Sequence, residues 1–386
     1  MKNKTLFIAT ATLIGTIIGA GILGLPYVIA KAGFLTGIFT VIFLGLAITL
    51  INLYVGEISL RTKGRHEMSG LAEKYLGKWG KALMTFSMIF VVYGMLTAYI
   101  MAEGQVLNNL FGLLPAFAYS LIFFAIISII IYLGLRKVGE SELWLVSIML
   151  IIIIIIVVWG FFHINPTNLN QFDYSKLFLP YGVIMFAFFG SAAIPEMRSI
   201  CSENKHLLKK AIIIGSLVPI VIYILYALVV VGSVGPAGLS DGEISTTVLD
   251  KIVSGKPMQI LGNLFAVLSM FTSAIAMGLA LLWVYHLDLG INRKLSFILT
   301  LAFPLALALS GLTSFIAAIA IAGAFAGGLQ GILVVLMYWK AKKYGDRSPE
   351  FEIKDFKFTG YILILLFTLG IVYTFLVVTG LIPVQL

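Results

Sequence analysis

Residues 13–27 read LIGTIIGAGILGLPY and interrupt a long apolar stretch with four glycines and a proline. The stretch is long enough to cross a bilayer, for which a helix needs about 20 apolar residues. Glycine and proline at this depth release backbone N–H and C=O groups that hydrocarbon cannot bind, so such a break survives only where protein buries it or where it lines a cavity. Many secondary transporters bind a small charged substrate at such a discontinuous helix. The segment therefore predicts a carrier rather than a simple membrane anchor.

The composition predicts an all-α integral membrane protein. Hydrophobic residues make up 60% of the 386 residues and charged residues 11%, whereas soluble domains carry about a quarter charged residues. An apolar window of bilayer length gives eleven candidate spans, at residues 5–30, 33–60, 82–108, 115–135, 142–162, 177–201, 207–232, 258–286, 292–310, 313–339 and 359–383. Residues 61–81, between two spans, are expected to form a solvated basic linker with room for a surface helix.

The positions of the basic residues predict the orientation. Of the 26 lysines and arginines, 22 fall in segments on the same side as the N-terminus if all eleven helices span. The positive-inside rule then places the N-terminus in the cytoplasm and the C-terminus outside, in a prokaryotic plasma (inner) membrane. The net charge of +9 is thus a topology signal, and nucleic acid is not an expected partner.

Several activities are excluded by what the sequence lacks. It contains no G-x-x-x-x-G-K-[ST] motif for ATP. Its six aspartates and four histidines fall in predicted loops or at helix ends, so neither an intramembrane protease nor a metal or haem cluster is indicated. The single cysteine, Cys201, excludes an internal disulfide. We therefore expect no enzymatic activity, no catalytic residues and no organic cofactor.

A second break supports an inverted repeat. Residues 185–196 read MFAFFGSAAIPE and place Gly190 and Pro195 in the middle of the sixth span. Gly190 follows Gly19 of the first break by 171 residues. Inverted-repeat transporters carry matched breaks of this kind. The expected division is a first five-helix half at 1–162, a second half at 163–343, and a loop with an eleventh helix at 344–386. Gly15 and Gly19 also form a G-x-x-x-G pair, which alone would indicate close helix packing.

The runs GTIIGAGILGLP in the first helix and FAFFGSAAIPE in the sixth resemble the amino acid–polyamine–organocation (APC) superfamily. The eleven helices and the I-P-E ending are most similar to the amino acid/auxin permease (AAAP) family and the bacterial aromatic amino acid permeases. The resemblance implies the leucine-transporter (LeuT) fold, a 5+5 inverted repeat with discontinuous helices 1 and 6. It also implies amino-acid symport by alternating access.

An amino-acid zwitterion within a membrane needs partners for both charges. The N–H groups of the first break can bind a carboxylate at the start of the outer half-helix, and carbonyls of the second break can accept an ammonium. The resemblance implies the same division of labour. The predicted substrate site comprises Ile18, Gly19, Ala20, Gly21, Tyr93, Thr97, Phe186, Phe189, Gly190 and Ser191. Its small residues leave room for a bulky side chain, aromatic or branched, and the lack of a charged residue near the breaks favours a neutral substrate.

Three of these assignments have structural alternatives. Phe186 aligns with the aromatic residue that closes over substrate in related carriers, but one of 28 phenylalanines can equally be a packing residue. Tyr93 and Thr97 share a helix face at i, i+4 and line the cavity only if that face is turned towards it.

The coupling ion has two candidates. Ser269, Thr272 and Ser273 share one face of the eighth helix, and the Thr272–Ser273 pair resembles the second sodium site of the fold. With carbonyls of Gly15 and Ile18 they would provide five oxygens for Na⁺, although such hydroxyls also bond back to their own helix. Proton coupling would instead use Glu103 or Glu196, since intramembrane carboxylates are expensive and usually functional. A passive channel and a non-transporting sensor remain as rival functions, and the oligomeric state is open.

Overall fold

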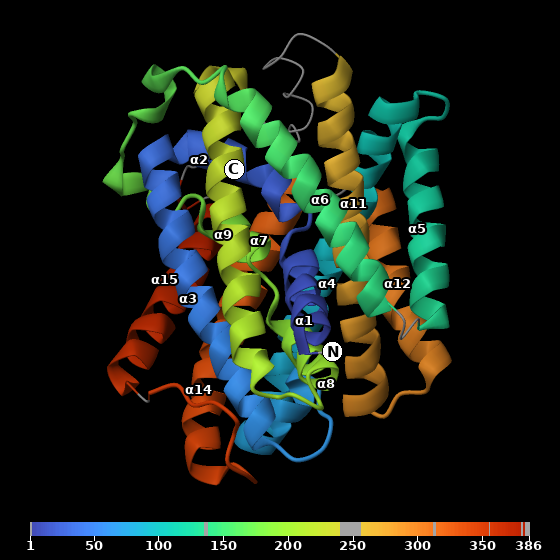
Figure 1. The fold of residues 1–386 in the computed structure, drawn as a ribbon, viewed down its shortest axis with the longest axis vertical. Coiled ribbons are helices and arrows are strands. Elements are labelled where there is room, and N and C mark those ends of the chain that lie inside the picture. The colour runs from blue at the N-terminus through green and yellow to red at the C-terminus, as the bar shows by residue number, and fades with distance from the viewer. Residues whose placement is uncertain are drawn as a thin grey trace.

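The computed structural model describes residues 2–134, 138–239, 256–311, 314–354, 356–379 and 381–382. They form a bundle of long helices (Figure 1). The α-helices are α1 (Lys2–Ile17), α2 (Gly21–Ala32), α3 (Phe34–Arg61), α4 (Met68–Phe111), α5 (Ala116–Leu133), α6 (Val138–Phe161), α7 (Tyr181–Ala187), α8 (Ile194–Ile200), α9 (Leu207–Val234), α11 (Lys256–Trp283), α12 (Arg293–Ser310), α13 (Phe315–Ile321), α14 (Gly328–Tyr344) and α15 (Lys357–Val378). Short 3₁₀ turns η1 (Pro166–Leu169), η2 (Tyr174–Lys176), η3 (Ser191–Ala193) and η4 (Pro236–Gly238), and π-helical turns η6 (Val284–Asp288) and η7 (Ala322–Gly327), connect or interrupt them.

The number of spans agrees with the sequence. The described residues contain ten helices that are long and apolar enough to cross a membrane. The pair Lys4–Ile17 and Gly21–Ala32, bent by 53° at its break, adds an eleventh span. The all-helical fold class and the discontinuous first and sixth helices are therefore confirmed. The division into two repeats and a final helix stays a prediction.

The prediction of a solvated linker at residues 61–81 was wrong in part. Residues 68–76 form a helix that is continuous with the third span across Gly77, whose φ of 76° only glycine adopts readily. Met68, Leu71 and Tyr75 of this helix are buried. The segment is therefore packed against the bundle rather than solvated.

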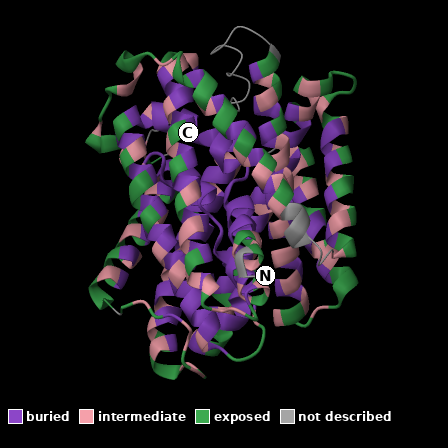
Figure 2. Ribbon diagram, in the orientation of Figure 1, coloured by how far each residue is buried: buried purple, intermediate pink, exposed green. Residues whose placement is uncertain are grey.

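Burial is greatest around the two broken helices. Buried residues fill the middle of the bundle, and exposed ones lie on its outer faces (Figure 2). In the most apolar 18-residue stretch of each span, 78% is buried for Tyr181–Ile200 and 22% for α15. The exposed residues of α15 include Leu365, Val372 and Phe375. An apolar surface of this extent needs lipid around it, so the sixth span lies inside a ring of lipid-facing helices.

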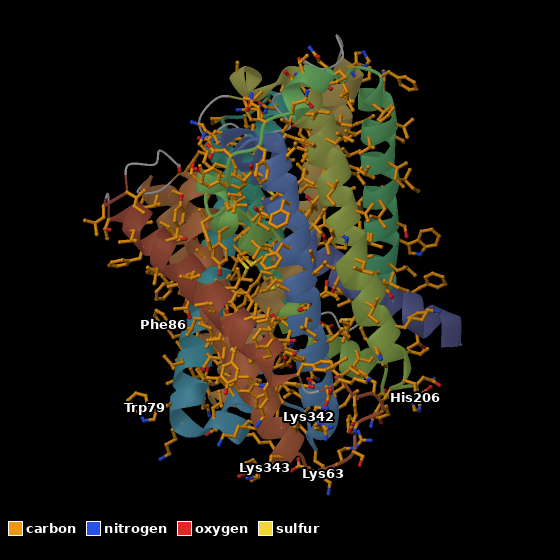
Figure 3. All side chains as sticks on the ribbon, turned by 90° about the vertical axis from the view of Figure 1, so that its left-hand side faces the viewer. Lys63, Trp79, Phe86, His206, Lys342 and Lys343 are labelled. Atoms are coloured by element: carbon orange, nitrogen blue, oxygen red, sulfur yellow. The ribbon has the colours of Figure 1, made fainter. Side chains whose placement is uncertain are left out.

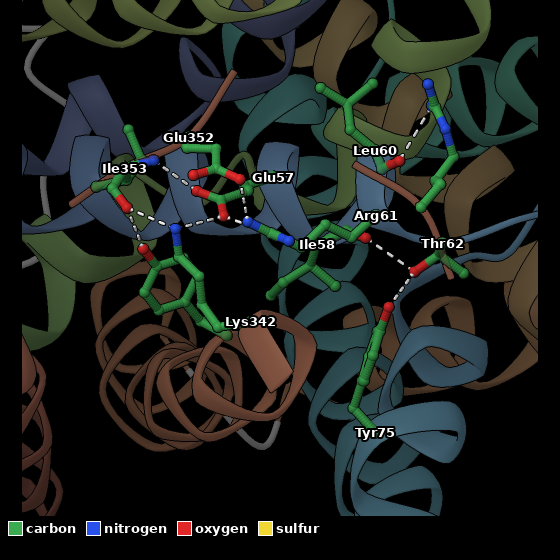
Figure 4. Close-up of polar contacts among 11 residues, drawn as sticks. Glu57, Ile58, Leu60, Arg61, Thr62, Tyr75, Lys342, Glu352 and Ile353 are labelled. Carbon is green, nitrogen blue, oxygen red and sulfur yellow. Dashed lines mark hydrogen bonds and ion pairs between the residues drawn. The ribbon is translucent and has the colours of Figure 1, made fainter. Parts of the chain in front are cut away.

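Charged residues gather at one end of the bundle. Lys63, His206, Lys342 and Lys343 lie together at its lower end in Figure 3. The same end contains a buried ion-pair network (Figure 4). The fully buried Glu57 carboxylate of α3 lies 2.8 Å from Arg61 Nε and 2.9 Å from Lys342 Nζ of α14. It also accepts the Ile353 N–H at 2.6 Å, so it joins α3, α14 and the segment that leads to α15.

Candidate functional site

The first break lies at Ile18, Gly19 and Ala20, between α1 and α2. The Gly19 N–H bonds the Ile17 carbonyl at 3.0 Å, which leaves the regular helical pattern, and α2 begins at Gly21. The first amides of a helix have no partner within it and form the positive end of its dipole. This break therefore places N–H groups in the interior of the protein, and their binding of an anion stays a prediction.

Tyr99 of α4 reaches into this break. Its hydroxyl lies 2.9 Å from Ser273 Oγ of α11, and the backbone amide of Ala20 is a second hydrogen-bonding neighbour. A Cβ added to Gly19 would collide with the Tyr99 hydroxyl and lie 2.9 Å from Ser273 Oγ. Because position 19 is glycine, the hydroxyls of Tyr99 and Ser273 can lie directly against the backbone of the first break. The sequence analysis missed Tyr99.

The second break lies against the first. α7 ends at Ala187, and Pro195 occupies the first turn of α8, where proline is well tolerated. A Cβ on Gly21 would lie 2.5 Å from Ala187 Cα, and one on Gly190 would lie 2.5 Å from Ile17 Cγ1. Gly21 therefore allows the two interrupted helices to touch at backbone distance, and Gly190 makes room for the Ile17 side chain.

Tyr223 of α9 connects the two breaks. Its hydroxyl lies 2.8 Å from the Ile17 carbonyl at the end of α1 and 2.8 Å from the Ala187 carbonyl at the end of α7. The side chain is fully buried and packs on the Phe188 ring at a centroid distance of 5.1 Å. The sequence analysis missed this residue as well.

The remaining predicted residues of the sixth helix lie in or beside the second break. The Phe186 ring is buried and meets the Tyr99 ring edge to face at a centroid distance of 6.3 Å. Phe189 is also buried, and the Ser191 hydroxyl accepts a hydrogen bond from Gln330 Nε2 at 3.0 Å. The π-helical turn η7, of a kind that is frequent at functional sites, packs on the Phe186 backbone. The structure therefore brings together Ile18 to Gly21 with Phe186 to Ser191.

Tyr93 and Thr97 lie elsewhere, which corrects the expected arrangement. They line an apolar cavity of about 560 Å³ between α4, α12 and α13, together with Phe90 and Phe303. The Tyr93 hydroxyl donates to the Leu299 carbonyl at 2.6 Å. Residues 93 and 97 occupy the α4 face that is turned away from the breaks, whereas Tyr99 occupies the face that meets them.

The predicted sodium ligands are close to the first break. The Ser273 hydroxyl bonds the Thr16 carbonyl at 3.1 Å, near Gly15 and Ile18. The Ser269 and Thr272 hydroxyls instead donate to carbonyls of their own helix, at 3.0 Å in both cases. A hydroxyl that donates in this way keeps its oxygen lone pairs, so these residues fit a cation without excluding the structural alternative.

The two candidate proton carriers differ in their surroundings. Glu103 lies one turn beyond Tyr99 on the same face of α4, is 1% exposed, and its Oε2 has no hydrogen-bond partner among the residues that the structure describes. Glu196, in the first turn of α8, borders a small cavity of about 50 Å³ that Arg65, Glu67 and Trp283 also line. Of the two, Glu103 is the carboxyl enclosed near the breaks.

Glu67, at the edge of that cavity and just before α4, has a perturbed pKa. Burial raises the pKa of its carboxyl to about 7. Arg65, whose Nη2 lies 3.6 Å from Glu67 Oε1, opposes this shift, and the charges of Asp288 and Glu196 add to it. This end of the bundle therefore carries a carboxyl that titrates near neutral pH.

Three comparisons relate this chain to known proteins. The sequence profile described as the tryptophan/tyrosine permease family matches residues 2–376. The chain is 27% identical to the tyrosine-specific transport system 1 of Haemophilus influenzae, with 96% of each chain covered. It is 23% identical to the tryptophan-specific transport protein of Shigella flexneri (88% and 87% covered) and 22% identical to glutamine transporter 2 of Aliivibrio fischeri (78% and 80% covered).

Among solved structures, the crystal structure of MhsT in complex with L-phenylalanine superimposes with a TM-score of 0.71 at 18% identity. The match covers 96% of this chain and 97% of that one. At this identity the match shows the fold alone, and it confirms the LeuT-type fold that the resemblance implied.

Proposed function

The chain belongs to the tryptophan/tyrosine permease family of the APC superfamily, and from this premise we propose that it is a secondary symporter of neutral aromatic amino acids. The family and its relatives are multi-pass membrane permeases, not enzymes. The observation that carries the proposal is the contact between the two interrupted helices, where Gly21 meets Ala187 and Gly190 meets Ile17. At the first of these contacts the backbone of one interrupted helix meets the backbone of the other inside a membrane protein.

The two charges of the substrate have separate partners in this arrangement. The carboxylate binds at the start of α2, where the Ala20 and Gly21 amides and the Tyr99 hydroxyl can donate to it. The ammonium binds at the carbonyl ends of α1 and α7, the negative ends of their dipoles. Phe186 beside Tyr99 then covers the substrate as a gate.

Transport follows from alternating access. The first, second, sixth and seventh spans rock as one bundle against the remaining helices, and the breaks expose the site to each side in turn. In the orientation we propose, the N-terminus and the end that carries Lys63 and Lys342 face the cytoplasm. The AAAP placement rests on the I-P-E sequence at residues 194–196 and is likewise our proposal.

Sodium is the coupling ion that we favour. Gly15, Ile18, Ser269, Thr272 and Ser273 would hold it, and the fit rests on the Ser273 hydroxyl, which crosses from α11 to the Thr16 carbonyl. A bound Na⁺ would supply positive charge at the carbonyl end of α1.

Proton coupling is the second candidate, because Glu103 is enclosed and the described part of the chain gives its Oε2 no partner. A carboxyl inside a membrane span is expensive and usually functional. The Glu103 carboxyl would then bind a proton on one side of the membrane and release it on the other.

Uptake into proteoliposomes tests the function and separates these ions. Radiolabelled tryptophan, tyrosine, phenylalanine and glutamine are supplied under a sodium gradient and, separately, under a pH gradient. Sodium-driven accumulation that Ser273→Ala abolishes and Glu103→Gln preserves would support the sodium site, and the reverse pattern would support protons. A flux that one substrate per conformational cycle cannot account for would indicate a channel. Binding without transport would indicate a sensor.

A further inference from the structure

The Tyr223 hydroxyl serves both broken helices at once. It lies 2.8 Å from the last carbonyl of α1, at Ile17, and 2.8 Å from the last carbonyl of α7, at Ala187. The end carbonyls of a helix lack partners within it and form the negative end of its dipole. The negative ends of two helix dipoles therefore meet at one neutral hydroxyl, and the Tyr223 side chain is fully buried.

A phenol has a single proton, so it cannot donate fully to both carbonyls together. A primary ammonium has three N–H donors and a positive charge, and it could satisfy both carbonyls at once. The position of the Tyr223 hydroxyl is thus the position where the ammonium of an amino acid would be most strongly bound.

Resting on the proposed function, we propose that the Tyr223 hydroxyl replaces the substrate ammonium in the empty carrier. When the amino acid is absent, the phenolic proton is shared between the Ile17 and Ala187 carbonyls. When the amino acid binds, its ammonium takes one carbonyl and the phenol keeps the other.

This role has a kinetic consequence. Net uptake requires the empty carrier to pass through its closed state on the return journey, whereas exchange of external for internal substrate never uses the empty form. Without the phenol, the Ile17 carbonyl would keep only the Gly19 N–H, and the Ala187 carbonyl would lose the donor that Tyr223 gives it. This is costly, since a buried acceptor without a donor loses its whole hydration. Tyr223 therefore matters for the return of the empty carrier and much less for the loaded carrier.

The test compares net uptake with exchange in proteoliposomes that contain Tyr223→Phe. We expect net uptake of radiolabelled phenylalanine to fall by about tenfold or more, while exchange stays within about twofold of the wild-type rate. Tyr181→Phe is the matched control, since Tyr181 is a buried tyrosine of α7 whose hydroxyl has no hydrogen-bond partner within the described ranges. It should leave both rates unchanged. Equal losses of exchange and net uptake in Tyr223→Phe, or no loss, would overturn the proposal.

A second variant covers the case in which Tyr223→Phe does not fold. Replacement of Tyr223 by 4-aminophenylalanine keeps the ring and provides two N–H donors, one for each carbonyl. We expect it to support net uptake and to raise the KM for phenylalanine, because the ammonium must displace a better donor. An unchanged KM would refute the idea. The wild-type protein is measured before any variant. If it neither exchanges nor accumulates aromatic amino acids, the proposed function itself is refuted.

Discussion

The contact between Gly21 and Ala187 makes Gly21→Ala the sharpest test of the site. The added Cβ would lie 2.5 Å from Ala187 Cα, 2.7 Å from its Cβ and 3.1 Å from its N, where ordinary contacts lie at 3.4–4 Å. Two of these atoms are backbone, so no side-chain rotation relieves the collision. The start of α2 and the end of α7 must therefore move apart by about 1 Å.

That displacement sets the expected magnitudes. Overpacking of this kind costs about 1–3 kcal/mol of folding free energy. Transport should suffer more, because a shift of about 1 Å in a binding geometry can cost up to 100-fold. We expect Gly21→Ala to fold and to raise the KM for phenylalanine uptake by roughly 10- to 100-fold.

Gly327→Ala is the control. Gly327 is also buried near the sixth span, but its added Cβ would lie 3.5 Å from Met185 Cε, an ordinary contact. Uptake KM and the thermal unfolding midpoint are measured for both variants in parallel. A Gly21→Ala protein with the wild-type KM would refute the placement of the substrate between α2 and α7.

Two further predictions concern the charged end of the bundle. Glu57→Gln leaves Arg61 and Lys342 without their buried carboxylate and should lower the unfolding free energy by about 3 kcal/mol. Glu73→Gln, which breaks an exposed pair, should cost under about 1 kcal/mol in the same denaturation assay, and equal losses would contradict this account. Because burial raises the pKa of Glu67 from 4.5 to about 7, the contribution of Glu67 to stability should be complete below pH 4.5 and fall as the pH rises towards 7. Glu67→Gln, which stays neutral, should lack this fall in thermal unfolding midpoints, and a persistent fall would assign the titration to another group.

The broken helices could be predicted from sequence because their cause is local. Glycine and proline at mid-membrane depth cannot continue a lipid-exposed helix, whatever surrounds them. The same reasoning indicated that residues near Gly19 and Gly190 would bind the substrate, and the structure brings these two segments together.

The contribution of α4 could not be predicted because its direction is not local. Tyr93 with Thr97, and Tyr99 with Glu103, are both polar pairs at i, i+4 on an apolar helix. A helix that is apolar on most sides gives no periodicity from which to choose the inward face. The sequence analysis chose the first pair, and the packing of α4 turns the second towards the break.

Tyr223 was missed for a related reason. It is one of two tyrosines, with Tyr226, in an apolar 28-residue helix, where a packing role is the ordinary expectation. Its role depends on two carbonyls that lie 206 and 36 residues away in the chain. Only the tertiary structure brings these atoms together.

Equilibrium binding of radiolabelled phenylalanine to the purified protein tests the central claim most directly. The claim is that the two breaks bind both charges of an amino acid. Phenethylamine, which lacks the carboxylate, and 3-phenylpropionate, which lacks the ammonium, are used as competitors. Because each analogue leaves one set of buried backbone groups without a partner, we predict that both compete at least about 100-fold more weakly than phenylalanine. An analogue that competes as well as the amino acid would show that the corresponding break does not bind that charge.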